Sequence, residues 1–354
     1  ICRGRDVSER RGGRWEVGAG GGGGAISHLP PPTSALRLRS RRAVTLLQQQ
    51  GALIALILVC IFGAVRYYAF PTPENLLNVL RQNSMLGLVA LGMTFVILTG
   101  GIDLSVGAVL AVAGVVAANL ADRGTLIAVT AGVAAGAVLG LTNGVVITKA
   151  RIQPFIVTLA MLIAARGAAL AATGEESVSV NRLASGFTWL GRGEIGPIPV
   201  PVLLFAIAYI AGWVVLRYTR FGRYVYAIGD NTEAARLMGL KVDRVLIGTY
   251  ALSGALAGLA GVILAARLGA GQPVAGTGWE LDAIAAVVVG GTLLTGGQGG
   301  AGSTLIGVLL LGVIFNLFNL EGTISPWWQW VSRGLFLLAV VVVQARLQHR
   351  AVRE

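Results

Sequence analysis

Residues 98–121 read LTGGIDLSVGAVLAVAGVVAANLA, with a double glycine and a lone aspartate between two long apolar segments. Inside a bilayer, a break in the helical backbone is tolerated only where neighbouring protein or water satisfies the freed N–H and C=O groups. The segment therefore predicts a membrane protein of several helices that encloses a polar interior.

The composition of the whole chain agrees with this prediction. Hydrophobic residues make up 55% of the 354 residues and charged residues 12%, whereas soluble domains carry about 25% charged residues. About 20 apolar residues cross a bilayer as a helix. We therefore predict an all-α polytopic membrane protein with about ten transmembrane helices, including broken or re-entrant segments. The apolar stretches are 50–70, 84–101, 104–121, 125–148, 154–173, 198–216, 245–267, 281–296, 303–320 and 328–345.

The net charge of +12 does not indicate nucleic-acid binding, because the arginines gather in the N-terminal tail and in loops on one side, as membrane topology requires. Cys2 and Cys60 lack the spacing of a disulfide or zinc motif. His28 and His349 lie outside the predicted spans. We expect no metal site, no nucleic-acid partner and no cofactor bound by this chain.

Arginine and lysine in short loops set the orientation of a membrane protein. If ten spans are correct, four basic groups face one side: those before span one, after span four, in the loop 217–244 and after span ten. Both termini are then cytoplasmic. We divide the chain into a disordered extension at 1–42, rich in glycine, proline and arginine, a transmembrane domain at 43–348 and a cytoplasmic tail at 349–354.

The stretch 125–148 carries Gly132, Gly136, Gly140 and Gly144, one glycine at every fourth position. In a helix these glycines form one ridge, and small residues let membrane helices approach closely. Chance spacing in a glycine-rich chain is the alternative. Four glycines in register favour packing against another helix.

Leu98-Thr99-Gly100-Gly101 recurs as Leu294-Thr295-Gly296-Gly297, and each tetrapeptide ends a short apolar stretch. Short, glycine-interrupted segments in both halves of a transporter point to its central site. The two copies lie six spans apart, which does not fit a five-plus-five duplication. We predict breaks in helical structure at six glycines: Gly100, Gly101, Gly296, Gly297, Gly299 and Gly300.

Asp103 lies near the start of a predicted span rather than in a loop. A carboxylate at membrane depth costs about 2.5–3.5 kcal/mol on insertion scales, which makes it a candidate for function. The alternative is an N-cap for a helix that opens at Leu104, and the two roles are compatible. Arg166 and Arg333 are charges within other spans, where snorkelling or internal pairing is the alternative to a pathway role.

The loop 217–244, RYTRFGRYVYAIGDNTEAARLMGLKVDR, contains one predicted short helix. Asp230 caps this helix with Glu233 as its third residue, and Gly239 ends it in the C′ position. A helix of about two turns is marginal in water on its own. Its small apolar surface predicts docking into a groove on another protein, and the alternative is that it rests on its own bundle.

Nucleotide hydrolysis by this chain is disfavoured by its lysines. A P-loop needs lysine after glycine, and neither Lys149 nor Lys241 follows one. No Ser/His or paired-carboxylate arrangement indicates an intramembrane enzyme, so we expect no catalytic residue. If ATP drives this protein, another chain binds it.

Four segments resemble the permease subunits of ribose/xylose-type ABC sugar importers, in the branched-chain amino acid and sugar permease superfamily. They are GGIDLSVGA at 100–108, RIQPFIVTLAMLIAARG at 151–167, TRFGRYVYAIGDNTEAARLMGL at 219–240 and GGTLLTGGQGGAGSTLIGVLLLG at 290–312. The resemblance extends from about residue 45 to 348. The second break is richer in glycine than the family pattern.

The resemblance implies a non-enzymatic transport subunit of a bacterial inner membrane that carries a pentose or hexose. Its implied partners are a second permease copy, identical or different, cytoplasmic ABC ATPase subunits that bind ATP and Mg²⁺, and an extracytoplasmic sugar-binding protein. It identifies 231–239 as the coupling helix in the ATPase cleft. The implied coupling residues are Asn231, Glu233, Ala234, Ala235, Arg236, Met238 and Gly239.

Polar side chains within the predicted spans are the candidates for the sugar pathway: Asn83, Asp103, Ser105, Asn143, Thr158, Asn316 and Asn319. Weak contacts suffice there, since tight binding prevents release. The alternative function is an ion- or proton-coupled secondary carrier. Such a carrier needs buried acidic or histidine relays, which are scarce in this sequence.

Overall fold

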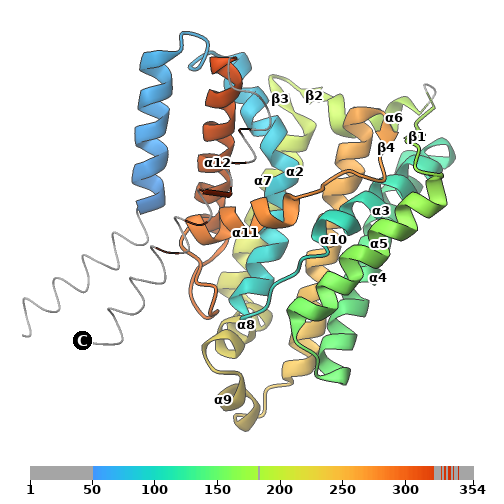
Figure 1. The fold of residues 1–354 in the computed structure, drawn as a ribbon, viewed down its shortest axis with the longest axis vertical. Helices are drawn as coiled ribbons and strands as arrows, with labels where there is room; N and C mark the ends of the chain where they lie inside the picture. The colour runs from blue at the N-terminus through green and yellow to red at the C-terminus, as the bar shows by residue number, and fades with distance from the viewer. Residues whose placement is uncertain are drawn as a thin grey trace, which may run out of the picture. The chain divides into compact units, whose positions relative to one another are not determined.

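The computed structural model describes residues 51–181 and 184–322, together with positions 328, 331, 334, 335, 338 and 342. This part of the chain is almost entirely helical (Figure 1). Seven of its helical segments are long and apolar enough to cross a membrane. They are α2 (Pro73–Leu98), α3 (Val106–Leu120) with a 3₁₀ turn (Ala121–Arg123), α4 (Thr125–Ala150), α5 (Pro154–Thr173), α7 (Val200–Tyr218), α10 (Val242–Leu268) and α12 (Ala301–Glu321).

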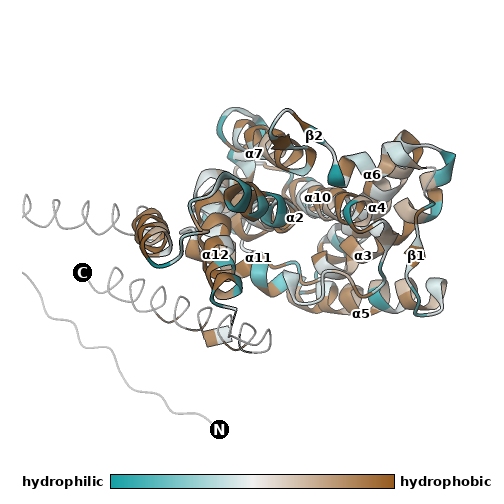
Figure 2. Ribbon diagram, turned by 90° about the horizontal axis from the view of Figure 1, so that it is seen from above, coloured by the Kyte–Doolittle hydropathy of each residue, from teal (hydrophilic) through white to brown (hydrophobic). Residues whose placement is uncertain are grey.

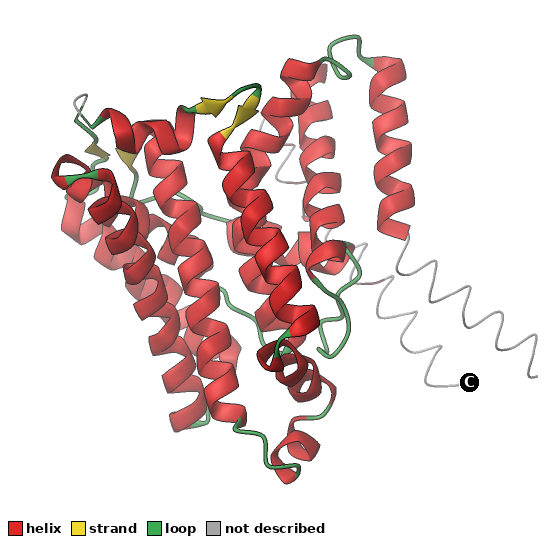
Figure 3. Cartoon of the chain, turned by 180° about the vertical axis from the view of Figure 1, so that it is seen from behind, coloured by secondary structure: helices red, strands yellow, loops and turns green. Residues whose placement is uncertain are grey.

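Shorter elements join these helices. An apolar helix, Gly51–Arg66, precedes α2. The remaining helices are α6 (Ser185–Arg192), α8 (Arg220–Asp230), α9 (Thr232–Leu237) and α11 (Trp279–Val289). Two antiparallel strand pairs, β1 (Val178–Ser179) with β4 (Ala270–Gly271) and β2 (Glu194–Ile195) with β3 (Ile198–Pro199), lie at the end opposite α9 (Figures 1 and 3).

The prediction of an all-α polytopic membrane protein is confirmed, but the expected span at 281–296 is wrong. Its helix, α11, has 11 residues and ends at Val289. Eleven residues rise about 16 Å, roughly half of a hydrocarbon core. Gly291, with φ of 102°, follows the helix end in a backbone conformation that favours glycine. Most of the span at 328–345 and both chain ends, including 1–42 and 349–354, lie outside the described residues.

Helix α2 begins earlier than its apolar stretch predicts. Pro73 occupies its first turn, and the Thr72 hydroxyl accepts a hydrogen bond from the Asn75 N–H. Proline at the first position and threonine at the N-cap are standard helix-start signals. Polar residues in the first half of α2 lowered its apparent hydropathy, so the predicted span began at residue 84.

Helix α10 is central to the packing, because α2, α3 and α4 all lie against it. The glycine ridge of α4 faces this helix. A methyl group added at Gly136 lies 2.3 Å from the Gly254 carbonyl oxygen, and one added at Gly140 lies 2.2 Å from the Tyr250 carbonyl oxygen. The two backbones therefore touch, which confirms the predicted packing role of the ridge.

We expect Gly140→Ala to destabilise the folded protein by about 1–3 kcal/mol, because the added methyl group forces α4 and α10 apart. Gly167→Ala on α5 is the matched control, since a methyl group there meets nothing within 4 Å. Thermal unfolding in detergent measures the difference. Equal melting temperatures for the two variants contradict this view of the interface.

Many apolar residues lie on the outer faces of the helices (Figure 2). Helices α4 and α5 are the least enclosed spans and α2 the most enclosed. Large exposed apolar side chains on α4 and α5 include Leu126, Val138, Phe155, Ile156 and Ile163. Lipid or another apolar surface must cover side chains of this kind.

Candidate coupling site and helix breaks

The loop 217–244 folds into two helices, α8 and α9, where one was predicted. The predicted cap at Asp230 is wrong, because Asp230 is the last residue of α8. Asn231 is extended and its N–H still donates to the Ala227 carbonyl oxygen at 3.2 Å. The Asn231 side-chain oxygen accepts a hydrogen bond from the Ala234 N–H at 2.9 Å, so Asn231 is the N-cap of α9.

Helix α9 ends in a Schellman motif. Gly239, with φ of 81°, donates its N–H to the Arg236 carbonyl oxygen at 2.9 Å. The Leu240 N–H donates to the Ala235 carbonyl oxygen at 3.1 Å. These two bonds are the 5→2 and 6→1 pairs of the motif. Ala235 and Leu240 both pack into the main apolar core, which fixes α9 to the bundle.

The opposite face of α9 is open. Leu237 is 89% exposed and Met238 is 70% exposed, and Glu233 and Arg236 are exposed as well. Arg236 Nη2 lies 3.6 Å from Asp243 Oδ1, so the arginine leans toward the start of α10. Leu237 was not among the predicted coupling residues, although it is more exposed than Met238. Ala235, which was predicted as a coupling residue, is buried, so it anchors α9 to the bundle.

Both predicted breaks are non-helical. One connects α2, which ends at Leu98, to α3, which begins at Val106. The other connects α11 to α12. All six predicted glycines lie in these connections, and four of them adopt positive φ: Gly100 (78°), Gly296 (88°), Gly297 (74°) and Gly299 (131°).

The structure brings the two breaks together. The Gly297 N–H donates to the Leu98 carbonyl oxygen at 3.0 Å. Leu98 belongs to the last turn of α2, whose carbonyl groups lack helical partners. A methyl group added at Gly100 lies 3.4 Å from the Thr295 carbonyl oxygen. The second break therefore caps the helix that ends in the first.

Asp103 is buried in a cluster of neutral hydrogen-bond donors. Asp103 Oδ1 accepts from the Ser105 N–H at 3.0 Å and from the Ser105 hydroxyl at 2.6 Å, and Oδ2 accepts from the Ser253 hydroxyl at 3.0 Å. Asn143 Nδ2 donates to the Ser105 hydroxyl at 2.9 Å. Asp103 thus orders the chain before α3, as a cap does, although the helix begins at Val106 and not at Leu104.

The predicted pathway residues fall into two groups. Asp103, Ser105 and Asn143 belong to the cluster just described, and Thr158 on α5 lies beside it, with its hydroxyl 3.4 Å from the Ile102 carbonyl oxygen. Asn83 and Asn316 lie instead between α2 and α12, and Asn319 lies farther along α12. Their role in a pathway stays a prediction.

Partners of these polar groups were missing from the prediction. Asn75 and Asn316 exchange two side-chain hydrogen bonds, at 3.1 and 2.8 Å. Ser253 and Tyr250 on α10 face the Asp103 cluster, and the Tyr250 hydroxyl is buried without a hydrogen-bond partner. Ser253 and Tyr250 are single polar residues in a long apolar stretch, so no periodic signal in the sequence distinguished them.

Arg166 is one of the charges predicted within a span, and it lies in α5. Arg166 donates to the Pro273 and Ala275 carbonyl oxygens at 2.6 and 2.8 Å, which confirms internal pairing. Arg333 lies outside the described residues.

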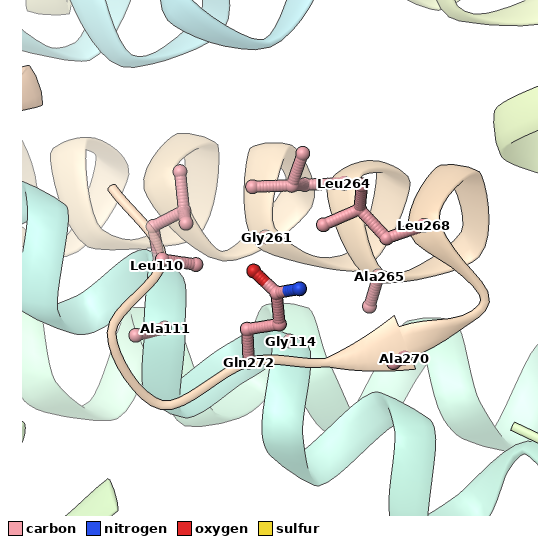
Figure 4. Close-up of a pocket in the computed structure, with 10 residues that line it drawn as sticks. Leu110, Ala111, Gly114, Gly261, Leu264, Ala265, Leu268, Ala270 and Gln272 are labelled. Carbon is pink, nitrogen blue, oxygen red and sulfur yellow. The ribbon is translucent and has the colours of Figure 1, made fainter. Parts of the chain in front are cut away.

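A small cavity lies between α3, α10 and the segment after β4 (Figure 4). Its lining is apolar apart from Gln272, whose amide projects toward α10.

Known proteins place the chain in a family. The family model described as branched-chain amino acid transport system / permease component matches residues 75–341. The ribose import permease protein RbsC of Escherichia coli K12 is 44% identical over 306 residues, 85% of this chain and 95% of that protein. The Bacillus subtilis protein of the same name is 45% identical over 302 residues, 85% of this chain and 94% of its own.

The L-arabinose ABC transporter permease protein AraH of Azospirillum brasilense is 38% identical over 284 residues, 79% of this chain and 83% of that protein. No solved structure matches the chain. The family match covers both breaks, α8 and α9. With seven candidate membrane-spanning helices in its described part, the chain is a multi-pass membrane protein that belongs to the branched-chain amino acid transport system / permease component family.

Proposed function

We propose that this chain is the permease subunit of a bacterial inner-membrane ABC importer for a monosaccharide, a pentose or hexose. The supporting observation is α9, a helix anchored by Ala235 and Leu240 that displays Leu237 and Met238. The proposed partners are cytoplasmic ATPase subunits that bind ATP and Mg²⁺, an extracytoplasmic sugar-binding protein and a second permease copy. The relatives named for ribose and L-arabinose support the substrate class.

The proposed cytoplasmic side is the end that carries α9. Helices α4 and α10 are antiparallel, because Gly132 packs on Val262 and Gly144 on Ile247. Lys149 and Arg151 at the end of α4 therefore lie near the start of α10, at the same end as α9. A concentration of basic residues at one end favours the cytoplasmic side.

A secondary carrier is the competing function, and the contacts of Asp103 disfavour it. Its carboxylate oxygens accept from the backbone N–H and hydroxyl of Ser105 and from the Ser253 hydroxyl. All of these donors are neutral, and they hold the chain before α3 in place rather than form a proton relay of acidic or histidine groups. A carrier driven by an ion gradient also needs no ATPase, so it gives no reason for the exposed apolar side chains of Leu237 and Met238 at the end of α9.

Reconstitution tests the proposal. Proteoliposomes receive the permease, its ATPase subunit and its binding protein, and uptake of radiolabelled ribose, arabinose, allose and leucine is measured. We expect ATP to drive accumulation of a monosaccharide and not of leucine, and a proton or sodium gradient alone to drive neither. Accumulation of leucine, or of sugar by an ion gradient without ATP, contradicts the proposal.

A further inference from the structure

The C-terminal end of α8 packs against both helix breaks at Gly229. A methyl group added at this residue lies 1.8 Å from the Leu98 carbonyl oxygen and 2.5 Å from the Gly297 nitrogen. Both atoms belong to the backbone, which cannot rotate away as a side chain can. Only glycine fits at this position in the present packing.

The same point joins the two breaks to each other. The hydrogen bond from the Gly297 N–H to the Leu98 carbonyl oxygen closes directly under Gly229. A methyl group added at Gly296 lies 2.8 Å from the Gly100 nitrogen and 3.1 Å from the Gly229 Cα. Three backbone segments therefore meet without side chains between them.

A second contact ties α8 to the later part of the second break. The Tyr226 hydroxyl donates to the Gly299 carbonyl oxygen at 2.8 Å. Gly299 has φ of 131° and lies in the non-helical connection between α11 and α12. This bond and the Gly229 contact fix α8 to the second break at two places.

Helix α9 follows Gly229 after Asp230 and Asn231. A displacement of α9 is therefore transmitted to Gly229 through Asp230, the last residue of α8, and through the extended residue Asn231. Backbone in direct contact transmits displacement, whereas flexible side chains absorb part of it, and packed interfaces respond in discrete steps. Because the breaks end α2 and α11 and precede α3 and α12, a shift at this junction reaches four helices.

From this geometry we infer that Gly229 is a positioning residue of transport: it transmits movement of α9 to both helix breaks. The inference rests on the proposed function, since it needs an ATPase that moves α9. Gly229 then has more than a packing role, because movement of α9 that ATP drives reaches the helix breaks through this residue.

Gly229→Ala in the full complex with ATPase subunit and binding protein tests this inference. The readout is the number of sugar molecules imported per ATP hydrolysed. We expect this ratio to fall about tenfold or more, since a misplacement of about 1 Å is enough to cost two orders of magnitude in a positioned reaction. ATPase binding persists, because the exposed face of α9 is unchanged.

Gly191→Ala is the matched control. Its added methyl group lies 2.1 Å from the Arg267 nitrogen, a backbone clash of similar severity between α6 and α10 at the opposite end. We expect this variant to lose stability, while the folded fraction keeps the wild-type ratio of sugar to ATP. An equal loss of ratio in both variants means that Gly229 has a packing role only, and overturns the inference.

Tyr226→Phe keeps the inference testable if Gly229→Ala does not fold, because it removes one hydroxyl and adds nothing. Loss of one hydrogen bond predicts a ratio about two- to tenfold lower. If Gly229→Ala does not fold, a wild-type ratio of sugar to ATP in Tyr226→Phe overturns the inference. If Gly229→Ala folds, wild-type ratios in both variants overturn it. Failure of the wild-type complex to import any sugar instead contradicts the proposed function, so the two failures are distinct.

Discussion

Replacing both Leu237 and Met238 with glutamate is expected to abolish ATP-driven uptake and to weaken ATPase binding by at least about 100-fold. Each apolar side chain contributes about 1.5–3 kcal/mol when fully buried, and 1.4 kcal/mol is tenfold in affinity. Both side chains are mostly exposed in the isolated permease, so their replacement removes few internal contacts. The melting temperature should stay near that of the wild type, since such surface changes usually cost less than about 0.5 kcal/mol.

Titration of the ATPase subunit against permease in nanodiscs measures this effect. Tyr68→Glu is the control, because Tyr68 is 96% exposed and lies in the turn before α2, at the other end of that helix from Leu98. We expect wild-type ATPase affinity for the control. If the double variant binds the ATPase as tightly as the wild type does, α9 is not the docking helix.

Replacing Asp103 with alanine is expected to destabilise the permease by about 3 kcal/mol or more. The substitution leaves the backbone N–H and hydroxyl of Ser105 and the hydroxyl of Ser253 without their acceptor. An unsatisfied buried polar group costs about 1–3 kcal/mol. The folded yield in detergent and the melting temperature measure the loss.

Asp103→Asn separates the structural role of this residue from a role in transport. Its amide oxygen can accept from Ser105, and its NH₂ group can donate to the Ser253 hydroxyl, so we expect folding close to the wild type. Asp122→Ala in the exposed 3₁₀ turn is the control for loss of an acidic residue. Unchanged stability of Asp103→Ala contradicts the capping role, and a folded Asp103→Asn without uptake adds a pathway role to it.

The apolar stretches predicted the fold class correctly because a bilayer selects for length and hydropathy, which are visible in a sequence. They failed at two helices. In the first half of α2, polar residues lower the hydropathy and most side chains are exposed or half-buried, whereas α11 is mostly buried but has only 11 residues. Hydropathy does not distinguish a half-length helix that ends in a glycine-rich break from a full span.

Local signals predicted some of the site and missed the rest for identifiable reasons. Gly239 ends α9 as its sequence indicates, since positive φ there favours glycine. Asp230 and Asn231 are both good caps, and the choice between them depended on where α8 ends. The contact between the two Leu-Thr-Gly-Gly segments, and the glycine on α8 that meets both, arise from tertiary packing that no local pattern specifies.

If this chain is a passive gate that a separate ATPase moves through α9, it cannot accumulate sugar by itself. Sugar accumulation is measured in proteoliposomes that contain the permease with its binding protein, with and without the ATPase subunit. We predict uphill accumulation only when the ATPase and ATP are both present. Uphill accumulation by the permease without the ATPase contradicts the claim.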